Sequence, residues 1–184
     1  MSYTLTVQLK GLSDSVIPDW ISEINKFNMQ VDVYPEFSFH GHAGFVPFKI
    51  VLHDCPNKAL NHRELMSGFE LYVHPMDTKS KNRPFLSKLF GRPRQLSPIE
   101  AKLSEADTEL IFHIRAEDSF EFRMGWYAAA SIALLCNGVL TDVQEEVQLE
   151  GQQLLHYALQ VVMDDERTMT EEEWRTHPFE GWLG

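Results

Sequence analysis

Polar and apolar residues alternate along several segments of the chain, and this alternation constrains the fold most. In residues 29–39 the odd-numbered positions from Met29 to Phe39 are mainly hydrophobic, while the even-numbered positions are mainly polar. Strands with one covered face show this period of two, whereas strands buried on both faces are apolar throughout. The pattern therefore predicts a mostly antiparallel sheet with one exposed face. The predicted strands are residues 3–9, 29–39, 46–53, 65–74, 108–115 and 138–144.

Helical periodicity separates these strands at several points. Residues 13–28 have an amphipathic pattern, and residues 119–136 are apolar nearly all round, with small residues where another backbone can come close. Residues 97–106 and 149–163 predict two more helices, and possible capping boxes begin at Ser97, Asp118 and Thr170. The order predicts an α+β fold, broadly ferredoxin-like, with helices packed on one face of the sheet.

Length and charge narrow the class of protein. The 184 residues predict a single domain over 1–184, and no apolar run approaches the length of a membrane-spanning helix. The first residues lack a signal-peptide pattern and there are only two cysteines, so we expect a cytoplasmic protein without a disulfide framework.

A formal charge of −11 argues against general affinity for nucleic acid. A basic connector at 76–96 contrasts with an acidic tail at 164–184, which the aromatic residues of its end are expected to pin to the body.

Two histidines one residue apart, His40 and His42, are candidate metal ligands. Zinc requires three or four ligands, and this pair on a strand supplies two. If 36–53 forms a hairpin, His53 lies about 16 Å from the pair at ~3.3 Å per residue, so a site requires His74 or His113 from another strand. We therefore favour exposed or interface histidines over a zinc site, and keep zinc as the alternative.

Familiar catalytic signatures are missing from the sequence. There is neither a nucleophile elbow nor a glycine-rich phosphate loop. Cys55 follows His53 and Asp54, which permits an activated thiolate, but close neighbours on an extended chain point to alternate sides. Cys136, at the end of an apolar helix, is most simply a small core residue. The sequence thus favours a protein that is not an enzyme.

The basic connector is the first candidate binding segment. It places four apolar residues between flanking cations, a pattern typical of a short helix that docks on a protein or an anionic surface. The competing interpretation is that its apolar residues anchor a long connection while its cations stay solvated. Its candidate binding residues are Lys81, Arg83, Phe85, Lys88, Phe90, Arg92 and Arg94.

The exposed sheet face is the second candidate. The alternation places Tyr72 and His74 away from the helices, with Glu36, Glu70 and His113 on the same side. Such a face suits a ligand or a second copy of the chain, and plain solvent exposure is the competing interpretation.

These features predict a binding or interaction protein, expected to be a homodimer. One specific version is an acidic inhibitor of a basic partner, such as an immunity-type protein that neutralises a toxin. The alternatives are a metal-assisted hydrolase that uses His40 and His42, and peripheral binding to an anionic surface through the basic connector.

Overall fold

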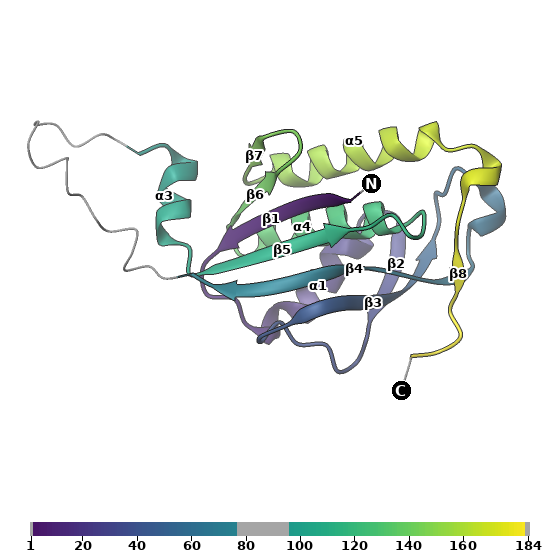
Figure 1. Cartoon of the computed structure of the whole chain (residues 1–184), viewed down its shortest axis with the longest axis horizontal. Helices are drawn as coiled ribbons and strands as arrows, with labels where there is room; N and C mark the ends of the chain where they lie inside the picture. The colour runs from purple at the N-terminus through teal and green to yellow at the C-terminus, as the bar shows by residue number, and fades with distance from the viewer. Residues whose placement is uncertain (1, 77–95, 183–184) are drawn as a thin grey trace, which may run out of the picture.

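An antiparallel sheet of eight strands forms the centre of the molecule. The computed structural model describes residues 2–76 and 96–182, and the strand order is β2-β3-β4-β5-β1-β6-β7, with β8 paired to β4 (Figure 1). Every pair of neighbouring strands is antiparallel. The strands are β1 Tyr3–Leu9, β2 Met29–Val33, β3 Ala43–Leu52, β4 Glu64–Pro75, β5 Thr108–Ile114, β6 Val139–Asp142, β7 Val147–Leu149 and β8 His177–Pro178.

The helices lie on one side and at one end of this sheet. In Figure 1 the central strands face the viewer and helices α1 and α4 lie behind them. Helix α5 packs along α4, whereas α3 lies at one end of the sheet, near β1 and β6. The α-helices are α1 Ile17–Asn25, α3 Pro98–Glu105, α4 Glu121–Leu135 and α5 Gln153–Thr168. The predicted α+β class, with an antiparallel sheet and packed helices, is confirmed.

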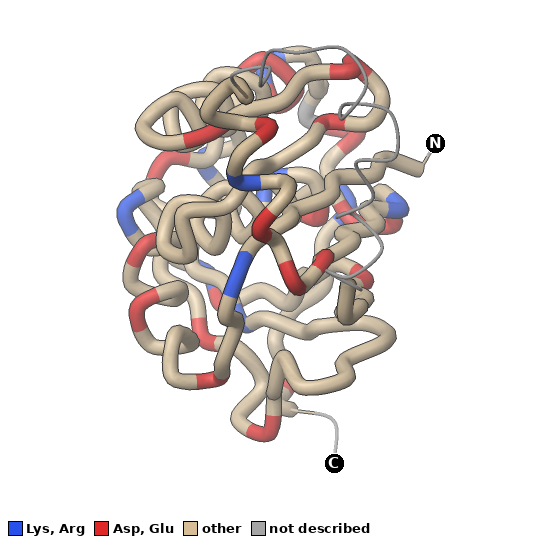
Figure 2. Tube along the Cα trace, turned by 90° about the vertical axis from the view of Figure 1, so that its left-hand side faces the viewer, with Lys and Arg blue, Asp and Glu red and all other residues tan. Residues whose placement is uncertain are grey.

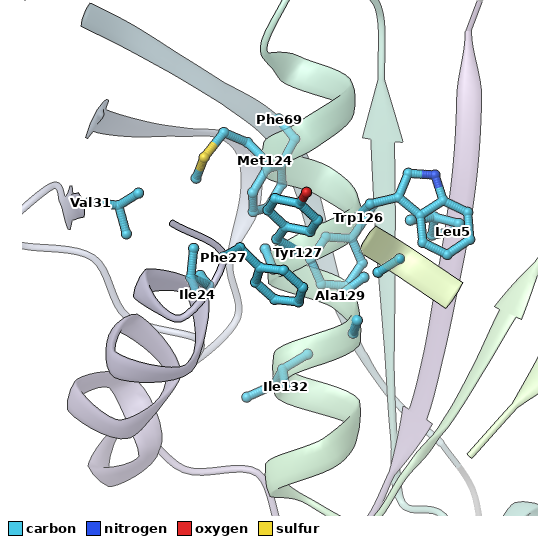
Figure 3. Packing of buried hydrophobic residues seen from close by; sticks show 14 of the residues in the cluster. Leu5, Ile24, Phe27, Val31, Phe69, Met124, Trp126, Tyr127, Ala129 and Ile132 are labelled. Carbon is cyan, nitrogen blue, oxygen red and sulfur yellow. The ribbon is translucent and has the colours of Figure 1, made fainter. Parts of the chain in front are cut away.

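The core fills the space between the sheet and α4. Leu5 and Phe69 project from the strands toward this helix, and Phe27 stacks on Tyr127 with ring centroids 3.8 Å apart (Figure 3). The helix approaches β5 closely at Gly125, where an added Cβ would lie 2.5 Å from Cδ1 of Ile114. The small residues of α4 therefore do what the sequence predicts, because they let the helix lie directly on the sheet.

The predicted strand at 29–39 is wrong beyond Val33. Residues 34–42 form a turn-rich loop, because Pro35 cannot donate to a strand ladder and the amide of Phe37 donates to the carbonyl of Tyr34. The carboxylate of Asp14 accepts hydrogen bonds from the Phe39 amide and the Ser38 hydroxyl. Phe39 consequently turns into the core, where it is 2 % exposed.

The ferredoxin-like plan is not confirmed, since the sheet contains short strands that the sequence analysis did not predict. The predicted strand at 138–144 ends at Asp142, and β7 follows after a tight turn. The second unpredicted strand, β8, takes the free edge of β4 beside Leu65 and Met66, where β5 does not reach. The last predicted helix begins at Gln153 and extends to Thr168.

Two of the three predicted capping boxes are confirmed. Ser97 with Glu100 caps α3, and Thr170 with Glu173 caps a short 3-10 helix. The box predicted at Asp118 does not form, because the Glu121 carboxylate instead accepts hydrogen bonds from the backbone amides of the turn that precedes α4. Asp118 itself is buried and accepts a hydrogen bond from the Phe120 amide.

Candidate functional site

The face of the sheet opposite the helices is the candidate site, and we call it the open face. In the part of the chain that the structure describes, no helix covers it. Strand register places a mixed set of outward side chains on the open face. Its central members are Thr6, Gln8, Phe45, Pro47, Lys49, Met66, Glu70, Tyr72, His74, Glu109, Ile111 and His113.

Tyr72 and His74, both predicted as binding residues, lie on the open face as the alternation indicates. The Tyr72 hydroxyl donates to Glu70 over 3.2 Å, and this hydrogen bond is the main cause of the raised pKa of Tyr72. Glu70 also pairs with Arg115 at 2.6 Å. His74 is exposed and lies opposite Glu109 in the register. Tyr72, Glu70 and Arg115 thus form a connected polar network on the open face, and His74 lies two residues after Tyr72 on the same strand.

Phe45 is the most exposed aromatic side chain of the open face, with 48 % of its surface in contact with solvent. Its ring lies over the bare backbone of Gly68 on the neighbouring strand. A Cβ added to Gly68 would lie 2.6 Å from the Phe45 ring and 2.2 Å from the Val46 carbonyl oxygen. Because Gly68 has no side chain, the Phe45 ring can lie across the two strands and still remain accessible to solvent.

Hollows flank Phe45 on two sides. The first, which we call the aromatic hollow, has a volume of about 380 Å³ and is lined by Tyr34, Glu36, Phe37, His42, Phe45, Pro47 and Met66. The second, of about 180 Å³, is lined by Phe45, Phe69, Glu70, His113, Arg115, Glu117 and Glu121. Phe45 belongs to both linings, so it separates an aromatic hollow from a charged one.

The alternation did not predict this arrangement, because it places the start of the third strand after Phe45. The observed strand starts at Ala43, and its alternation then places Phe45, Pro47 and Val51 outward together. Three apolar residues at solvent-facing positions of one strand are the signal that could have located the surface.

His40 and His42 do not converge on one site. His42 lines the aromatic hollow, where its ring lies edge-on to Phe37 at 5.2 Å. His40 is exposed and lines a different hollow of about 600 Å³, beside Asp14 and Val73. Across residues 2–76 and 96–182, no group of three or more His, Cys, Asp and Glu side chains is arranged to hold a metal ion. The zinc prediction thus gains no third ligand from the described chain.

The seven candidate binding residues of the basic connector lie outside the described residues. They are Lys81, Arg83, Phe85, Lys88, Phe90, Arg92 and Arg94, within 77–95. Residues 77–95 hold six of the 16 Lys and Arg but one of the 27 Asp and Glu. The rest of the chain therefore has 10 cations against 26 carboxylates, and Figure 2 shows the acidic positions spread widely over the trace.

A buried ion cluster, which no sequence pattern predicts, lies on the helical side of the sheet. Arg123 is 3 % exposed and binds both carboxylate oxygens of Glu166, at 2.6 and 2.7 Å, and Asp54 at 3.1 Å. Cys55 lies near this cluster but is fully buried, and burial raises the pKa of its thiol. A raised pKa opposes thiolate formation, so the cluster fits a structural role better than nucleophilic chemistry.

Asp118 is a buried carboxyl group near the start of α4. Burial raises its pKa to about 6, although hydrogen bonds from the Phe120 amide and the Ser67 hydroxyl act in the opposite direction. The nearby Glu121 raises this pKa further and His177 lowers it. Asp118 is therefore protonated in the folded protein at pH values where the unfolded chain, with a pKa near 3.8, is ionised.

We expect Asp118→Asn to flatten the pH dependence of stability. A raised folded-state pKa stabilises the protein below about pH 4, and this contribution falls as the pH rises to about 6. The lost contribution is about 2–3 kcal/mol at 1.36 kcal/mol per pKa unit, and the asparagine variant should lack it. Urea unfolding between pH 4 and 7 measures the difference.

Ser67→Ala provides the second variant for this test. This substitution removes the Ser67 hydroxyl, which donates a hydrogen bond that favours the ionised form of Asp118. The pH-dependent loss of stability should therefore move to higher pH. Parallel pH profiles for wild type and the asparagine variant would contradict the assignment to Asp118.

Comparisons with known proteins assign no family. No family model matches the sequence, and no curated protein and no solved structure shows significant similarity to the chain. Among the described helices, none combines the length and apolar character that crossing a membrane requires.

Proposed function

We propose that this chain is a binding protein that uses its open face to hold a basic protein partner. The observation that carries the proposal is Phe45, an aromatic ring that is half exposed, held over Gly68 and flanked by two hollows. Exposed aromatic anchors beside pockets are typical centres of protein interfaces. The polar network of Glu70, Tyr72 and Arg115 would form the rim beside this anchor.

Charge supports a basic partner. With 10 Lys and Arg against 26 Asp and Glu outside residues 77–95, this part of the chain would attract a cationic protein and speed its association. An acidic inhibitor of the immunity type fits this description, since it would cover a basic partner without chemistry of its own. The proposal therefore includes that version.

A second copy of the chain is the other candidate occupant of the open face. Homodimerisation would bring two strongly acidic surfaces together unless the cations of residues 77–95 offset the repulsion. Light scattering at low and high salt tests it: a salt-sensitive dimer would support self-association, and a monomer in both conditions would leave the open face for a different protein.

Photocrosslinking in cells tests the proposed partner class. A photoreactive amino acid in place of Phe45 should capture a basic protein, whereas the same group in place of Leu159 should not. Leu159 is a matched control because it is an exposed apolar residue, 37 % exposed, on the helix α5. Capture of the same protein from both positions, or of no protein from position 45, would contradict the proposal.

Once that partner is purified, Phe45→Ala should weaken its binding by about 2–4 kcal/mol, as expected for truncation of a central anchor. Leu159→Ala should leave the affinity unchanged. Calorimetric titration measures both, and circular dichroism checks that both variants remain folded. Equal affinities for wild type and the Phe45 variant would show that the open face is not the binding surface.

A further inference from the structure

We infer that the aromatic hollow receives the cationic end of a Lys or Arg side chain from the partner. This inference rests on the proposed function, because it names the group that the partner presents. The hollow combines the rings of Tyr34, Phe37 and Phe45 with one carboxylate, Glu36. Aromatic rings grouped around a site attract ammonium and guanidinium groups through the negative potential of their faces.

Glu36 distinguishes this hollow from a purely apolar one. The Tyr34 hydroxyl donates to its carboxylate over 3.2 Å, and the negative charge of Glu36 is the main cause of the raised pKa of Tyr34. An apolar occupant would remove water from this carboxylate without supplying a counter-charge, which is unfavourable. An anion would be repelled, so a cation with an apolar stem fits the lining best.

Lys49 does not supply this cation. Lys49 lies two residues after Pro47 on β3, but its ammonium group pairs with Asp32 at 2.8 Å and lies 3.7 Å from the carboxylate of Glu64. Its ammonium group also lies over the ring of Phe179, 5.7 Å from the centroid. This intramolecular contact shows the same combination of cation, ring and carboxylate in use on the neighbouring part of the open face.

The rings of the aromatic hollow are held before any ligand arrives. Phe37 packs against Trp20 and Phe39, with centroids 5.7 and 4.9 Å away, and the Phe45 ring lies on Gly68. Tyr34 lies edge-on to Trp182 of the C-terminal segment at 5.9 Å. These contacts restrict the rings before a ligand binds, which lowers the ordering cost of binding a single cationic group.

The aromatic hollow is also large enough for one basic side chain. At about 380 Å³, the aromatic hollow is near the lower limit of small-molecule pockets, which measure about 300–1,000 Å³. That space accepts a guanidinium or ammonium group with its methylene stem. The volume is therefore sufficient for a single basic side chain inserted beside Phe45.

A titration with n-butylguanidinium chloride, followed by NMR on the full chain, tests the inference without the partner. We expect saturable shifts at Tyr34, Glu36 and Met66, with a dissociation constant on the order of 1–10 mM. n-Butanol provides the uncharged probe of equal stem length, and sodium chloride at equal ionic strength controls for salt. The cation should bind about five times more tightly than the alcohol.

Two variants assign the binding to the lining. Glu36→Gln should weaken n-butylguanidinium binding by about twofold to fivefold, as expected for an exposed carboxylate, while leaving n-butanol unaffected. Phe45→Ala should weaken the binding of both probes. Glu146→Gln is the matched charge control, because Glu146 is exposed in the turn between β6 and β7, at the opposite edge of the sheet from β2. It should change neither.

The outcomes separate this inference from the proposed function. Equal binding of the cation and the alcohol, no saturable shift up to about 100 mM, or equal losses in Glu36→Gln and Glu146→Gln would each overturn the cation site. Partner capture at position 45 would then still support the open face. Conversely, saturable cation binding without partner capture would retain the site and remove the proposed partner.

Discussion

Replacing Arg123 with methionine should lower the free energy of unfolding by about 3–5 kcal/mol, because it leaves the Glu166 carboxylate buried without a counter-charge. Glu166 is 4 % exposed in its side chain, and both of its oxygens accept hydrogen bonds from Arg123. Asp54 loses one hydrogen bond, but its side chain is 37 % exposed and water can replace the guanidinium there. Urea unfolding at neutral pH measures the loss.

Two further variants identify the cause of that loss. Arg123→Met combined with Glu166→Leu removes both buried charges and should recover most of the stability, since buried ion pairs often contribute little beyond an apolar replacement. Arg167→Met is the matched control, because Arg167 is exposed on the same helix as Glu166 and lies 3.6 Å from Asp164. It should cost about 0.5 kcal/mol or less. Equal losses for the single variants at positions 123 and 167 would contradict the buried-charge explanation.

Trp20→Ala should have the second large effect, a loss of about 3–5 kcal/mol. Trp20 is fully buried on α1 and packs on Phe39 and Phe48, with centroids 5.1 and 5.7 Å away. Its indole nitrogen donates to the Ala128 carbonyl of α4 over 2.9 Å, so this one side chain connects α1, the sheet and α4. Unfolding is followed by circular dichroism, since the substitution itself alters tryptophan fluorescence.

Trp182→Ala is the matched control for Trp20. Trp182 is only partly buried and contacts Tyr34 and Phe179, so its removal should cost about 1 kcal/mol or less. Trp20→Phe keeps an aromatic ring in the core and should fall between the two alanine variants. A smaller loss for Trp20→Ala than for Trp182→Ala would show that the α1 contact is not central to the core.

The Trp20→Ala substitution also tests how the core supports the open face. Phe37 packs on Trp20 and also lines the aromatic hollow, so Trp20→Ala should weaken n-butylguanidinium binding as well as stability. Phe45→Ala should weaken the binding without a comparable loss of stability, because Phe45 is half exposed. This contrast separates residues that support the hollow from residues that only line it.

The alternation of polar and apolar residues was sufficient to predict the central strands that have one covered face. Residues 3–9 form β1 as predicted, and the outward positions of β4 include Tyr72 and His74 as expected. The alternation failed at 34–39, where it continues past the end of β2. Period two there reflects aromatic residues turning into the core from a loop, and Pro35 was the local signal against a strand.

The sites depend on residues that are distant in the sequence. Arg123 and Glu166 lie 43 positions apart, and only the packing of α5 on α4 brings them together. Phe45 becomes an anchor because Gly68, on the next strand, lacks a side chain beneath it. Neither relation has a local periodicity, so neither could be predicted from one sequence.

Local chemistry in the sequence therefore determined the α+β class, the exposed polar face and the acidic character of the chain. These follow from side-chain polarity along short segments, which acts wherever the segment lies in the fold. Tertiary structure alone decided the strand order, the buried ion cluster and the aromatic hollow, because each requires register and packing between distant segments. The predicted histidine pair shows the difference: His40 and His42 are close in sequence, yet they line separate hollows.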